Sequence, residues 1–546
     1  MTRPSDSARR RIDGWGFCGQ SYPPSTAMMR WLGERLGEPR RLPVLDPASL
    51  RGDEPASLPD LGCAIGQELI ERFACSRGQG LPDLLRLRSG SVPRLADAVA
   101  RPADDDELRE LLAAGDRHRL VIVPRGGGTS VTGGVNVPAG DAPVVIADLR
   151  ALSGLEKLDE TSGLATFGAG TTGPELESAL AAKGWTLGHF PQSWELSTLG
   201  GWIATHSAGQ ESLGYGRIES LVAGLELVAP AGELRLPAMP ASAAGPDLRQ
   251  LVLGSEGRFG VITRATMRIR LRPESTRIEA VLMPDFDTGI EAARVLVQSG
   301  LPLKLLRLSD AVETEVAMTV GLADSALAPL VRGWLQLRGF GKGACLLLLG
   351  AAGAHSSVVT VFESTRRTLR PYGGAWLGPR PGRKWLADRF RHPYLRDALL
   401  DAGYATETFE TAAPWSGLER LGATVRDAMR AGAAAGESEL PLLCHLSHPY
   451  RDGASLYFTF FFRCPRDPDR AVTRWADLKR RASAAVAAGG GTLSHHHGVG
   501  SWHAPWLANE AGDDGCRVLR RVAAELDPRG ILNPHVLLDP SDRLEG

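Results

Sequence analysis

A glycine-rich loop directly after an apolar strand is the feature that most restricts how this chain can fold. Residues 120–124 (Leu-Val-Ile-Val-Pro) form the apolar run, and Arg125-Gly-Gly-Gly-Thr-Ser-Val-Thr-Gly-Gly follows at once. Three consecutive glycines let a backbone curl so that several amides face one way and hold phosphate oxygens. Thr129 and Ser130 add hydroxyl donors. No Gly-Lys-Ser/Thr follows, which excludes a Walker loop, and an ordinary glycine turn is the alternative.

A second glycine string, Gly168-Ala-Gly-Thr-Thr-Gly173, has the literal spacing of a dinucleotide-binding fingerprint. That fingerprint requires an acidic residue about 20 residues later, at the end of the next strand. Glu195 lies near this distance, but it belongs to a Pro-Gln-Ser-Trp loop. We therefore expect a tight turn from a strand into a helix at this string, and not a Rossmann site.

Two more segments have the small residues that let a backbone approach a flat ligand. Residues 191–209 (PQSWELSTLGGWIATHSAG) are rich in hydroxyls and glycine, and residues 253–263 (LGSEGRFGVIT) place glycines at 254, 257 and 260 just ahead of a strand. Glycine permits close approach because it has no Cβ. An ordinary buried loop is the alternative for the first of these segments.

Three adjacent histidines, His495, His496 and His497, precede Gly-Val-Gly. In an extended chain His495 and His497 share a face, and His496 opposes them. The neighbouring sequence offers no carboxylate or cysteine, and adjacent histidines converge poorly on one ion. Proton transfer or anion binding is therefore favoured over a metal site, and a structural role stays open.

Composition narrows the class of protein. The chain has 546 residues and a net charge of −1, with 43% hydrophobic and 23% charged residues, which favours a folded enzyme and argues against a nucleic-acid partner. Seven scattered cysteines favour a reducing compartment. The first residues lack an apolar signal segment, and residues 344–354, the longest apolar run, are too short to span a bilayer. We expect a cytoplasmic protein and leave a peripheral membrane contact open.

Local patterns divide the chain into four parts. Residues 1–91 show helical patterns, and residues 92–273 alternate strands with helices, which is typical of an α/β or α+β domain. Residues 274–500 mix helices with strands, and residues 501–546 are expected to be helical.

Together the glycine loop and the two further segments resemble the flavoproteins of the vanillyl-alcohol-oxidase and p-cresol-methylhydroxylase type, over about residues 92–273. The resemblance implies an α+β fold: a two-subdomain FAD-binding domain, an α+β substrate-binding cap domain, and helical N- and C-terminal segments. It also implies noncovalent FAD. The implied FAD-binding residues are Pro124, Arg125, Gly126, Gly127, Gly128, Thr129, Ser130, Pro191, Gln192, Ser193, Ser197, Thr198, Gly201, Ala204, Thr205, His206, Ser207, Glu256, Gly257, Gly260, Val261 and Ile262.

Within that group the chain resembles the alkyldihydroxyacetonephosphate synthase family over nearly its whole length. Trp15-Gly-Phe, the segment 407–415 (ETFETAAPW), the segment 456–461 (LYFTFF) and the string 494–500 (SHHHGVG) are similar to that family's motifs. The resemblance implies an ether-lipid enzyme that exchanges the fatty acid of acyl-dihydroxyacetone phosphate for a long-chain fatty alcohol. The exchange passes through a covalent flavin adduct without net redox change, and the family precedent suggests a homodimer.

The same resemblance assigns residue roles. Tyr457 and His495, His496 and His497 match catalytic positions, while Arg307 and Arg396 match positions tied to substrate phosphate. A phenol can transfer a proton if its pKa is lowered, and arginine's planar fork suits phosphate oxygens. From their neighbours alone, the arginines would be surface charges and Tyr457 a core aromatic. Two stretches depart from the family pattern: residues 206–216 (HSAGQESLGYG), and residues 501–506 (SWHAPW), where the family tends to be basic.

Two other functions are weighed against this one. An FAD-linked oxidoreductase of a D-2-hydroxy acid shares the flavin domain, but that class usually has a His-x-Gly-Asp-Gly-Asn metal motif. The matching stretch here is His448-Pro-Tyr-Arg-Asp-Gly-Ala-Ser, which lacks it, and no metal site is predicted. A flavin-binding scaffold without turnover is disfavoured because Tyr457 and the three histidines are intact.

Overall fold

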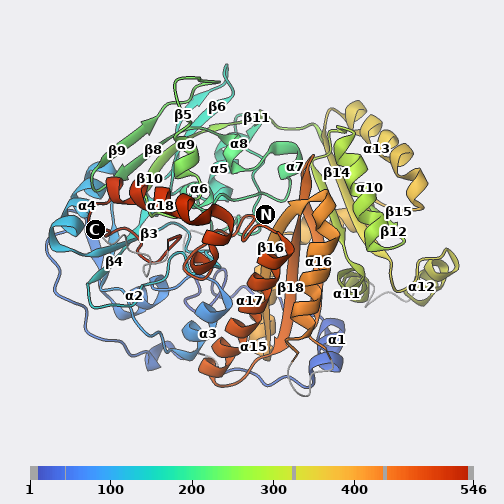
Figure 1. The fold of residues 1–546 in the computed structure, drawn as a ribbon, viewed down its shortest axis with the longest axis horizontal. Helices are drawn as coiled ribbons and strands as arrows, with labels where there is room; N and C mark the ends of the chain where they lie inside the picture. The colour runs from blue at the N-terminus through green and yellow to red at the C-terminus, as the bar shows by residue number, and fades with distance from the viewer. Residues whose placement is uncertain (1–9, 44, 322–327, 434–438, 539–546) are drawn as a thin grey trace.

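The computed structural model describes residues 10–43, 45–321, 328–433 and 439–538. Figure 1 shows two halves: two sheets with their helices, made mainly by residues 64–271, and a large sheet with helices on both faces, made by residues 275–489. The chain crosses from one half to the other between Leu271 and Ser275.

The first sheet carries the glycine loop. Its order is β1-β2-β4-β3, with β2, β4 and β3 parallel and β1 antiparallel at one edge. The strands are β1 (Ala64–Gly66), β2 (Ala98–Arg101), β3 (Val121–Arg125) and β4 (Val144–Asp148). Helix α4 (Asp105–His118) connects β2 to β3; Asp104 caps it, and it buries Leu108, Leu111 and Leu112. The predicted strand before the glycine loop is therefore present as β3.

The second sheet is antiparallel, in the order β5-β6-β10-β8-β9. Its strands are β5 (Leu155–Asp159), β6 (Leu164–Gly168), β8 (Val222–Ala229), β9 (Gly232–Leu236) and β10 (Val261–Arg268), beside a short pair β7 (Trp185–Thr186) and β11 (Arg270–Leu271). Helices α5 (Gly173–Ala181), α6 (Leu199–Ala204), α7 (Ser212–Tyr215), α8 (Ile218–Leu221) and α9 (Arg249–Val252) accompany it. The string 168–173 is the turn from β6 into α5. Because β6 has antiparallel neighbours, the expected strand-to-helix turn is confirmed and a Rossmann unit is excluded here.

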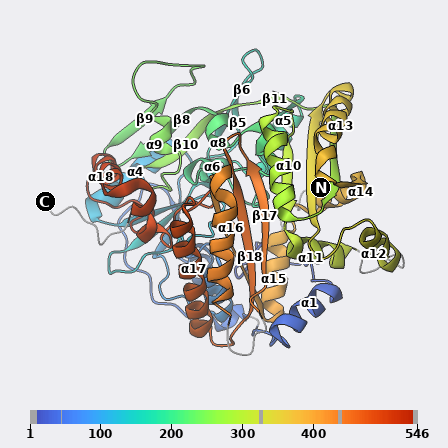
Figure 2. The same cartoon turned by 45° about the vertical axis from the view of Figure 1, so that its right-hand side comes forward.

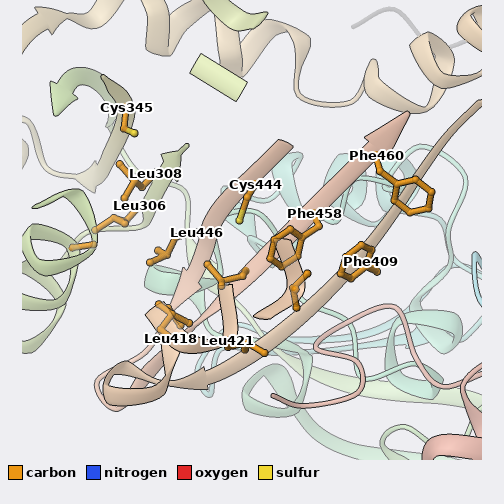
Figure 3. Close-up of a cluster of buried hydrophobic side chains, with 14 of the residues drawn as sticks. Leu306, Leu308, Cys345, Phe409, Leu418, Leu421, Cys444, Leu446, Phe458 and Phe460 are labelled. Atoms are coloured by element: carbon orange, nitrogen blue, oxygen red, sulfur yellow. The ribbon is translucent and has the colours of Figure 1, made fainter. Parts of the chain in front are cut away.

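The third sheet has seven antiparallel strands in the order β15-β12-β14-β13-β17-β18-β16. They are β12 (Ser275–Met283), β13 (Leu305–Ser309), β14 (Cys345–Gly353), β15 (Ala375–Gly378), β16 (Tyr404–Pro414), β17 (Leu442–Pro449) and β18 (Gly453–Arg463). One face packs against α10 (Phe286–Gln298), α13 (His355–Leu369), α16 (Trp415–Arg430) and α17 (Pro468–Gly489), as Figure 2 shows for α10, α16 and α17. Figure 3 shows part of this core, to which the sheet contributes Leu306, Leu308, Leu446 and Phe458, and α16 contributes Leu418 and Leu421.

The opposite face of this sheet is turned toward the half made mainly by residues 64–271, to which the resemblance assigns FAD and which is called the flavin-binding half below. Helices α11 (Ala311–Gly321), α12 (Ala328–Leu337), α14 (Pro379–Asp388) and α15 (His392–Ala402) surround it, and α1 (Thr26–Leu36) packs on α11. Side chains alternate along a strand, so Leu306 and Leu308 enter the helical core while Arg307 faces the other side. None of the described helices is both long and apolar enough to cross a bilayer.

The terminal segments differ from the expectation. In residues 10–91, the helices are α1, α2 (Leu69–Cys75), α3 (Leu81–Ser89) and a single 3-10 turn, η1 (Pro47–Ser49), and β1 joins the first sheet. This segment is less helical than we expected because prolines at 39, 43, 47, 55 and 59 interrupt it. After η4 (Ala504–Trp506) and α18 (Ala508–Leu526), the C-terminal segment returns to the first sheet, where Leu532 pairs with Ile122.

Candidate active site

A cavity of about 1240 Å³ lies between the flavin-binding half and the open face of the seven-stranded sheet. The strand register brings two polar residues of its lining, His445 and Tyr457, into one row with a buried carboxylate, Glu410. His445 of β17 pairs with Tyr457 of β18, and Tyr457 pairs with Glu410 of β16. Arg307 of β13 reaches the same row, because its Nη2 lies 3.1 Å from His445 Nδ1. The sheet therefore collects an arginine, a histidine, a phenol and a carboxylate from four strands.

The glycine loop forms the opposite wall. It packs tightly on the second predicted segment: a Cβ on Gly127 would lie 2.7 Å from the carbonyl carbon of Leu196 and 2.9 Å from Ser197 Cα. The third segment meets the first, since a Cβ on Gly257 would lie 3.1 Å from Pro124 Cγ. The three segments that the resemblance assigned to FAD thus come together on one side of one cavity.

This wall fits a bound pyrophosphate. The amides of Gly127, Gly128 and Thr129 make no hydrogen bond to any part of the chain that the structure describes. Such free amides in a glycine turn can hold phosphate oxygens. Most predicted cofactor residues line the cavity, namely Pro124, Gly126, Gly127, Gly128, Thr129, Ser130, Pro191, Gln192, Ser193, Ser197, Thr198, Gly201, Ala204, Thr205, Ser207, Glu256, Gly257, Gly260, Val261 and Ile262.

Two predicted cofactor residues lie elsewhere. Arg125 is buried behind the loop, where its guanidinium occupies the space that a Cβ on Gly128 would need. His206 has φ +55° and turns its ring toward Glu219, with 3.4 Å between Nε2 and Oε2. Neither side chain lines the cavity: Arg125 supports the glycine turn from below, and His206 lies at a reversal of the backbone. Their assignment to FAD binding stays a prediction.

A buried carboxylate that sequence reasoning missed shapes the histidine loop. Glu410 Oε1 accepts hydrogen bonds from the amides of His495, His496 and His497, at 3.2, 3.0 and 2.8 Å. Glu410 Oε2 lies 2.5 Å from His497 Nδ1. His496 and His497 line the cavity, whereas His495 lies behind them. One glutamate from the cap sheet therefore determines the path of the loop that carries all three histidines.

Glu256, predicted as a cofactor residue, holds the same loop from the flavin-binding half. Its Oε1 accepts from the amides of Val499 and Gly500, at 2.7 and 3.1 Å. Asn533 of the C-terminal segment donates to the Glu256 carbonyl at 2.8 Å. Glu256 still lines the cavity, but its carboxylate serves the histidine loop.

Burial shifts the titratable groups strongly. Burial raises the pKa of Glu256 to about 7, although the amides of Val499 and Gly500 lower it. Burial would also raise the pKa of Glu410, but its interactions with His497 and His496 and the loop's hydrogen bonds hold it well below its ordinary value. Burial lowers the pKa of His496 to about 3. At neutral pH His496 is an uncharged imidazole and Glu410 a carboxylate.

Burial also determines the protonation state of Tyr457. Together with the nearby Glu410 and Glu407 carboxylates, it raises the pKa of the phenol. Its ring stacks on His445, with 4.9 Å between the centroids, and lies 5.9 Å from the ring of His496. The phenol therefore keeps its proton at neutral pH and acts as a donor.

The sequence of this site has known relatives. Residues 96–236 match the FAD binding domain, and residues 272–537 match the C-terminal domain of FAD linked oxidases. The chain is 31% identical over 482 residues to an alkyldihydroxyacetonephosphate synthase of Trypanosoma brucei brucei, a match that covers 85% of this chain and 77% of the relative. The chain belongs to the alkyldihydroxyacetonephosphate synthase family.

Solved structures agree with this assignment. A solved alkyldihydroxyacetonephosphate synthase superposes with a TM-score of 0.82 and 26% identity, covering 96% of this chain and 98% of the other. p-Cresol methylhydroxylase has the same fold, with a TM-score of 0.68 at 14% identity. The expected family, the two-part flavoprotein fold and the FAD cofactor are confirmed.

The two arginines assigned by resemblance to this synthase family both reach the cavity wall. Arg307 Nη2 donates to Glu313 Oε1 at 2.6 Å. Arg396 Nη1 donates to the Gln79 carbonyl at 2.6 Å, and its Nη2 lies 3.2 Å from Asp397 Oδ1. Each keeps donors beyond these bonds, because a guanidinium has five N–H groups.

An arginine that the sequence analysis did not single out also lines the cavity. Arg380, near the start of α14, lines the cavity and forms no ion pair within the described residues. Nothing in its Gly-Pro-Arg-Pro neighbourhood signals a function.

The histidine nitrogens are engaged with one another and with neighbouring groups. His495 Nδ1 lies 2.9 Å from His496 Nδ1, a hydrogen-bond distance, and His448 Nδ1 lies 2.9 Å from Ser212 Oγ. His497 Nδ1 is paired with Glu410. These contacts engage the Nδ1 atoms of the histidines. The ligand atoms of His448, His495 and His496 lie within 4.8 Å of one another, as do those of Glu410, His496 and His497, so both groups have the spacing of a metal site, and the absence of a metal stays a prediction.

Proposed function

We propose that this chain exchanges the fatty acid of acyl-dihydroxyacetone phosphate for a long-chain fatty alcohol and so forms an ether-lipid precursor without net redox change. One observation carries the proposal. A single cavity is lined by the three FAD segments, by Tyr457, His496, His497 and Arg307, and by a large apolar surface. A small hydroxy acid would have no use for that apolar surface, whereas a long alkyl chain would bury it.

The apolar surface lies on both sides of the polar row. Toward α12 and α14 it consists of Leu282, Leu305, Leu335, Leu346, Leu348 and Leu377; toward α1 and α15 it consists of Met28, Leu399, Leu443 and Phe461. Bound FAD supplies the nucleophilic chemistry of the exchange. The residues of the chain then bind the phosphate through Arg307 and Arg396 and exclude water from the reacting carbon.

Proton transfer falls to the neutral groups in the polar row. His496 is an uncharged imidazole that can take a proton from a reacting group, and Tyr457 retains a hydroxyl proton that it can donate to a leaving oxygen. Glu410 keeps the histidine loop in place for this step, because it accepts three of the loop's amides.

We also propose a peripheral membrane contact at α11 and α12. Val320 lines the cavity, and Leu330 and Leu337 of α12 are 69% and 90% exposed. Figure 2 shows α12 at the edge of the molecule. A chain entering from a bilayer would pass these side chains, and loss of vesicle binding in a Leu330→Ser, Leu337→Ser variant tests the contact. A homodimer, proposed from the family precedent alone, is tested by light scattering. The cytoplasmic location stays a prediction.

The exchange is tested with purified holoprotein, kept anaerobic, with acyl-dihydroxyacetone phosphate and a long-chain alcohol. Mass spectrometry should find the ether product and free fatty acid, with the flavin still oxidised afterwards. Tyr457→Phe and His496→Ala should each abolish exchange while retaining FAD. No exchange, together with bleaching of the flavin by D-2-hydroxy acids, would instead assign the chain to the oxidoreductases.

A further inference from the structure

Tyr450 is connected to the active-site histidines by a continuous chain of hydrogen-bond distances. Its Oη lies 2.6 Å from His495 Nε2, and His495 Nδ1 lies 2.9 Å from His496 Nδ1. His496 lines the cavity, His495 is 5% exposed, and Tyr450 is partly exposed on the far side. His495 thus has one ring nitrogen toward His496 and the other toward Tyr450.

The backbone of Tyr450, at the outer end of this series of hydrogen bonds, is fixed by two further hydrogen bonds. Tyr450 follows β17 in the turn to β18, where its amide donates to the Gly453 carbonyl at 2.7 Å. Its own carbonyl accepts from Trp415 Nε1 at 3.1 Å. Both backbone groups are satisfied, so the fold directs the side chain. Its hydroxyl oxygen accepts from Arg217 Nη1 at 3.5 Å and lies at hydrogen-bond distance from His495 Nε2.

We propose that Tyr450, His495 and His496 form a proton relay between the reacting centre and the exterior of the protein. This inference rests on the proposed function, because the exchange reaction needs protons moved at the substrate. The relay gives Tyr450 a functional role in addition to the roles of Tyr457 and the histidines.

The relay moves one proton without moving a heavy atom. His496 Nε2 takes a proton from a reacting group, and the proton on His496 Nδ1 passes to His495 Nδ1. The proton on His495 Nε2 then passes to Tyr450 Oη, which releases its own hydroxyl proton to water. One N–H bond forms at the inner end and one O–H bond breaks at the outer end, so charge and atoms balance. The reverse sequence returns a proton to the substrate.

Burial and the nearby Arg217 disfavour a proton that stays on the central histidine. Arg217 Nη2 donates to the His495 carbonyl at 2.9 Å, and the His448 ring lies 5.1 Å from the His495 ring. Burial, His448, His496 and Arg217 all disfavour a resident positive charge there. The titratable and charged groups that face the relay are Arg217, Glu219, Glu410, His445, His448, Asp452 and His497.

Tyr450→Phe tests the relay, because it removes the hydroxyl and keeps the ring. Tyr404→Phe is the matched control: it removes a buried hydroxyl that donates to the Gly37 carbonyl at 2.8 Å, far from the histidines. We expect Tyr450→Phe to slow exchange about ten- to hundredfold at neutral pH and to change the pH profile of kcat. Added imidazole buffer should restore part of the rate, and FAD retention should match the control.

Several results would overturn the relay. One is a wild-type rate and pH profile in Tyr450→Phe; another is an equal loss at every pH that imidazole does not relieve. If the wild-type protein shows no exchange, the proposed function fails separately, and the ¹⁵N shifts of the histidine rings then decide. A shift of the His495 and His496 nitrogens in Tyr450→Phe but not in Tyr404→Phe supports the relay, and unchanged shifts refute it.

Discussion

The packing of the glycine loop leads to a prediction for one substitution, Gly127→Ala. The added Cβ would overlap the Leu196 carbonyl oxygen and lie 2.7 Å from its carbon and 2.9 Å from Ser197 Cα. All three are backbone atoms, so no flexible side chain can turn away. Ordinary carbon contacts begin near ~3.4 Å, so the loop must move by at least ~0.7 Å. It would move toward the cavity, because the obstacle lies on the opposite side.

The displacement should weaken FAD binding measurably. Adding a methyl group to a well-packed site costs about 1–3 kcal/mol. If this cost is felt mainly in the bound state, it corresponds to about a fivefold to 150-fold rise in the Kd for FAD, since each 1.4 kcal/mol is a factor of about ten. The loss acts through loop position alone, because glycine and alanine have the same backbone amide.

The assay is a titration of the FAD-free protein, following the quenching of flavin fluorescence. Gly341→Ala is the matched control, because a Cβ there meets no atom within 4 Å and its backbone is ordinary. That variant should bind FAD as the wild type does. An unchanged Kd for Gly127→Ala would refute the assignment of this loop to the cofactor.

Three other predictions follow from the carboxylates and the flavin. Glu410→Gln keeps one acceptor but removes a buried charge, so urea unfolding should show a loss of about 3 kcal/mol, which the exposed Glu419→Gln should not show. Glu256 has a folded pKa of about 7 against an ordinary 4.5, so the folded protein keeps a proton that the unfolded chain releases. The stability of the FAD-free protein should therefore fall by about 3 kcal/mol as pH rises from about 4.5 to 7. Urea unfolding of Glu256→Gln should not show this fall. An equal fall in the variant would show that another group, and not Glu256, causes the loss of stability. Urea should also release all yellow colour into an ultrafiltrate; colour that stays with the chain would contradict noncovalent FAD.

Local patterns were enough for features that depend on neighbouring residues in the chain. The strand before the glycine loop and the turn from β6 into α5 were predicted because periodicity and glycine act over a few residues. The clustering of three FAD segments was expected only through the family resemblance, because the segments are about 60 residues apart.

Features that depend on register or burial were missed. Glu410 and Tyr457 are 47 positions apart, and only the pairing of β16 with β18 brings them together. Tyr450 gains its role from a hydrogen bond to His495, 45 positions away, which no spacing rule anticipates. The rise in the pKa of Tyr457 could not be predicted, because burial is a property of the folded chain and not of the residue's neighbours in sequence.

The histidine loop is where the two halves of the protein are joined chemically. The loop has no regular secondary structure, so its shape depends on the groups that accept its amides. Glu410, from the cap sheet, accepts hydrogen bonds from the amides of the three histidines. Glu256, from a flavin segment, accepts hydrogen bonds from the amides of Val499 and Gly500. Because each carboxylate belongs to a different half, a shift of the cap relative to FAD would break one set of bonds. The same two side chains therefore position the imidazoles relative to both the cap-bound substrate and the flavin, which a reaction between those two partners requires.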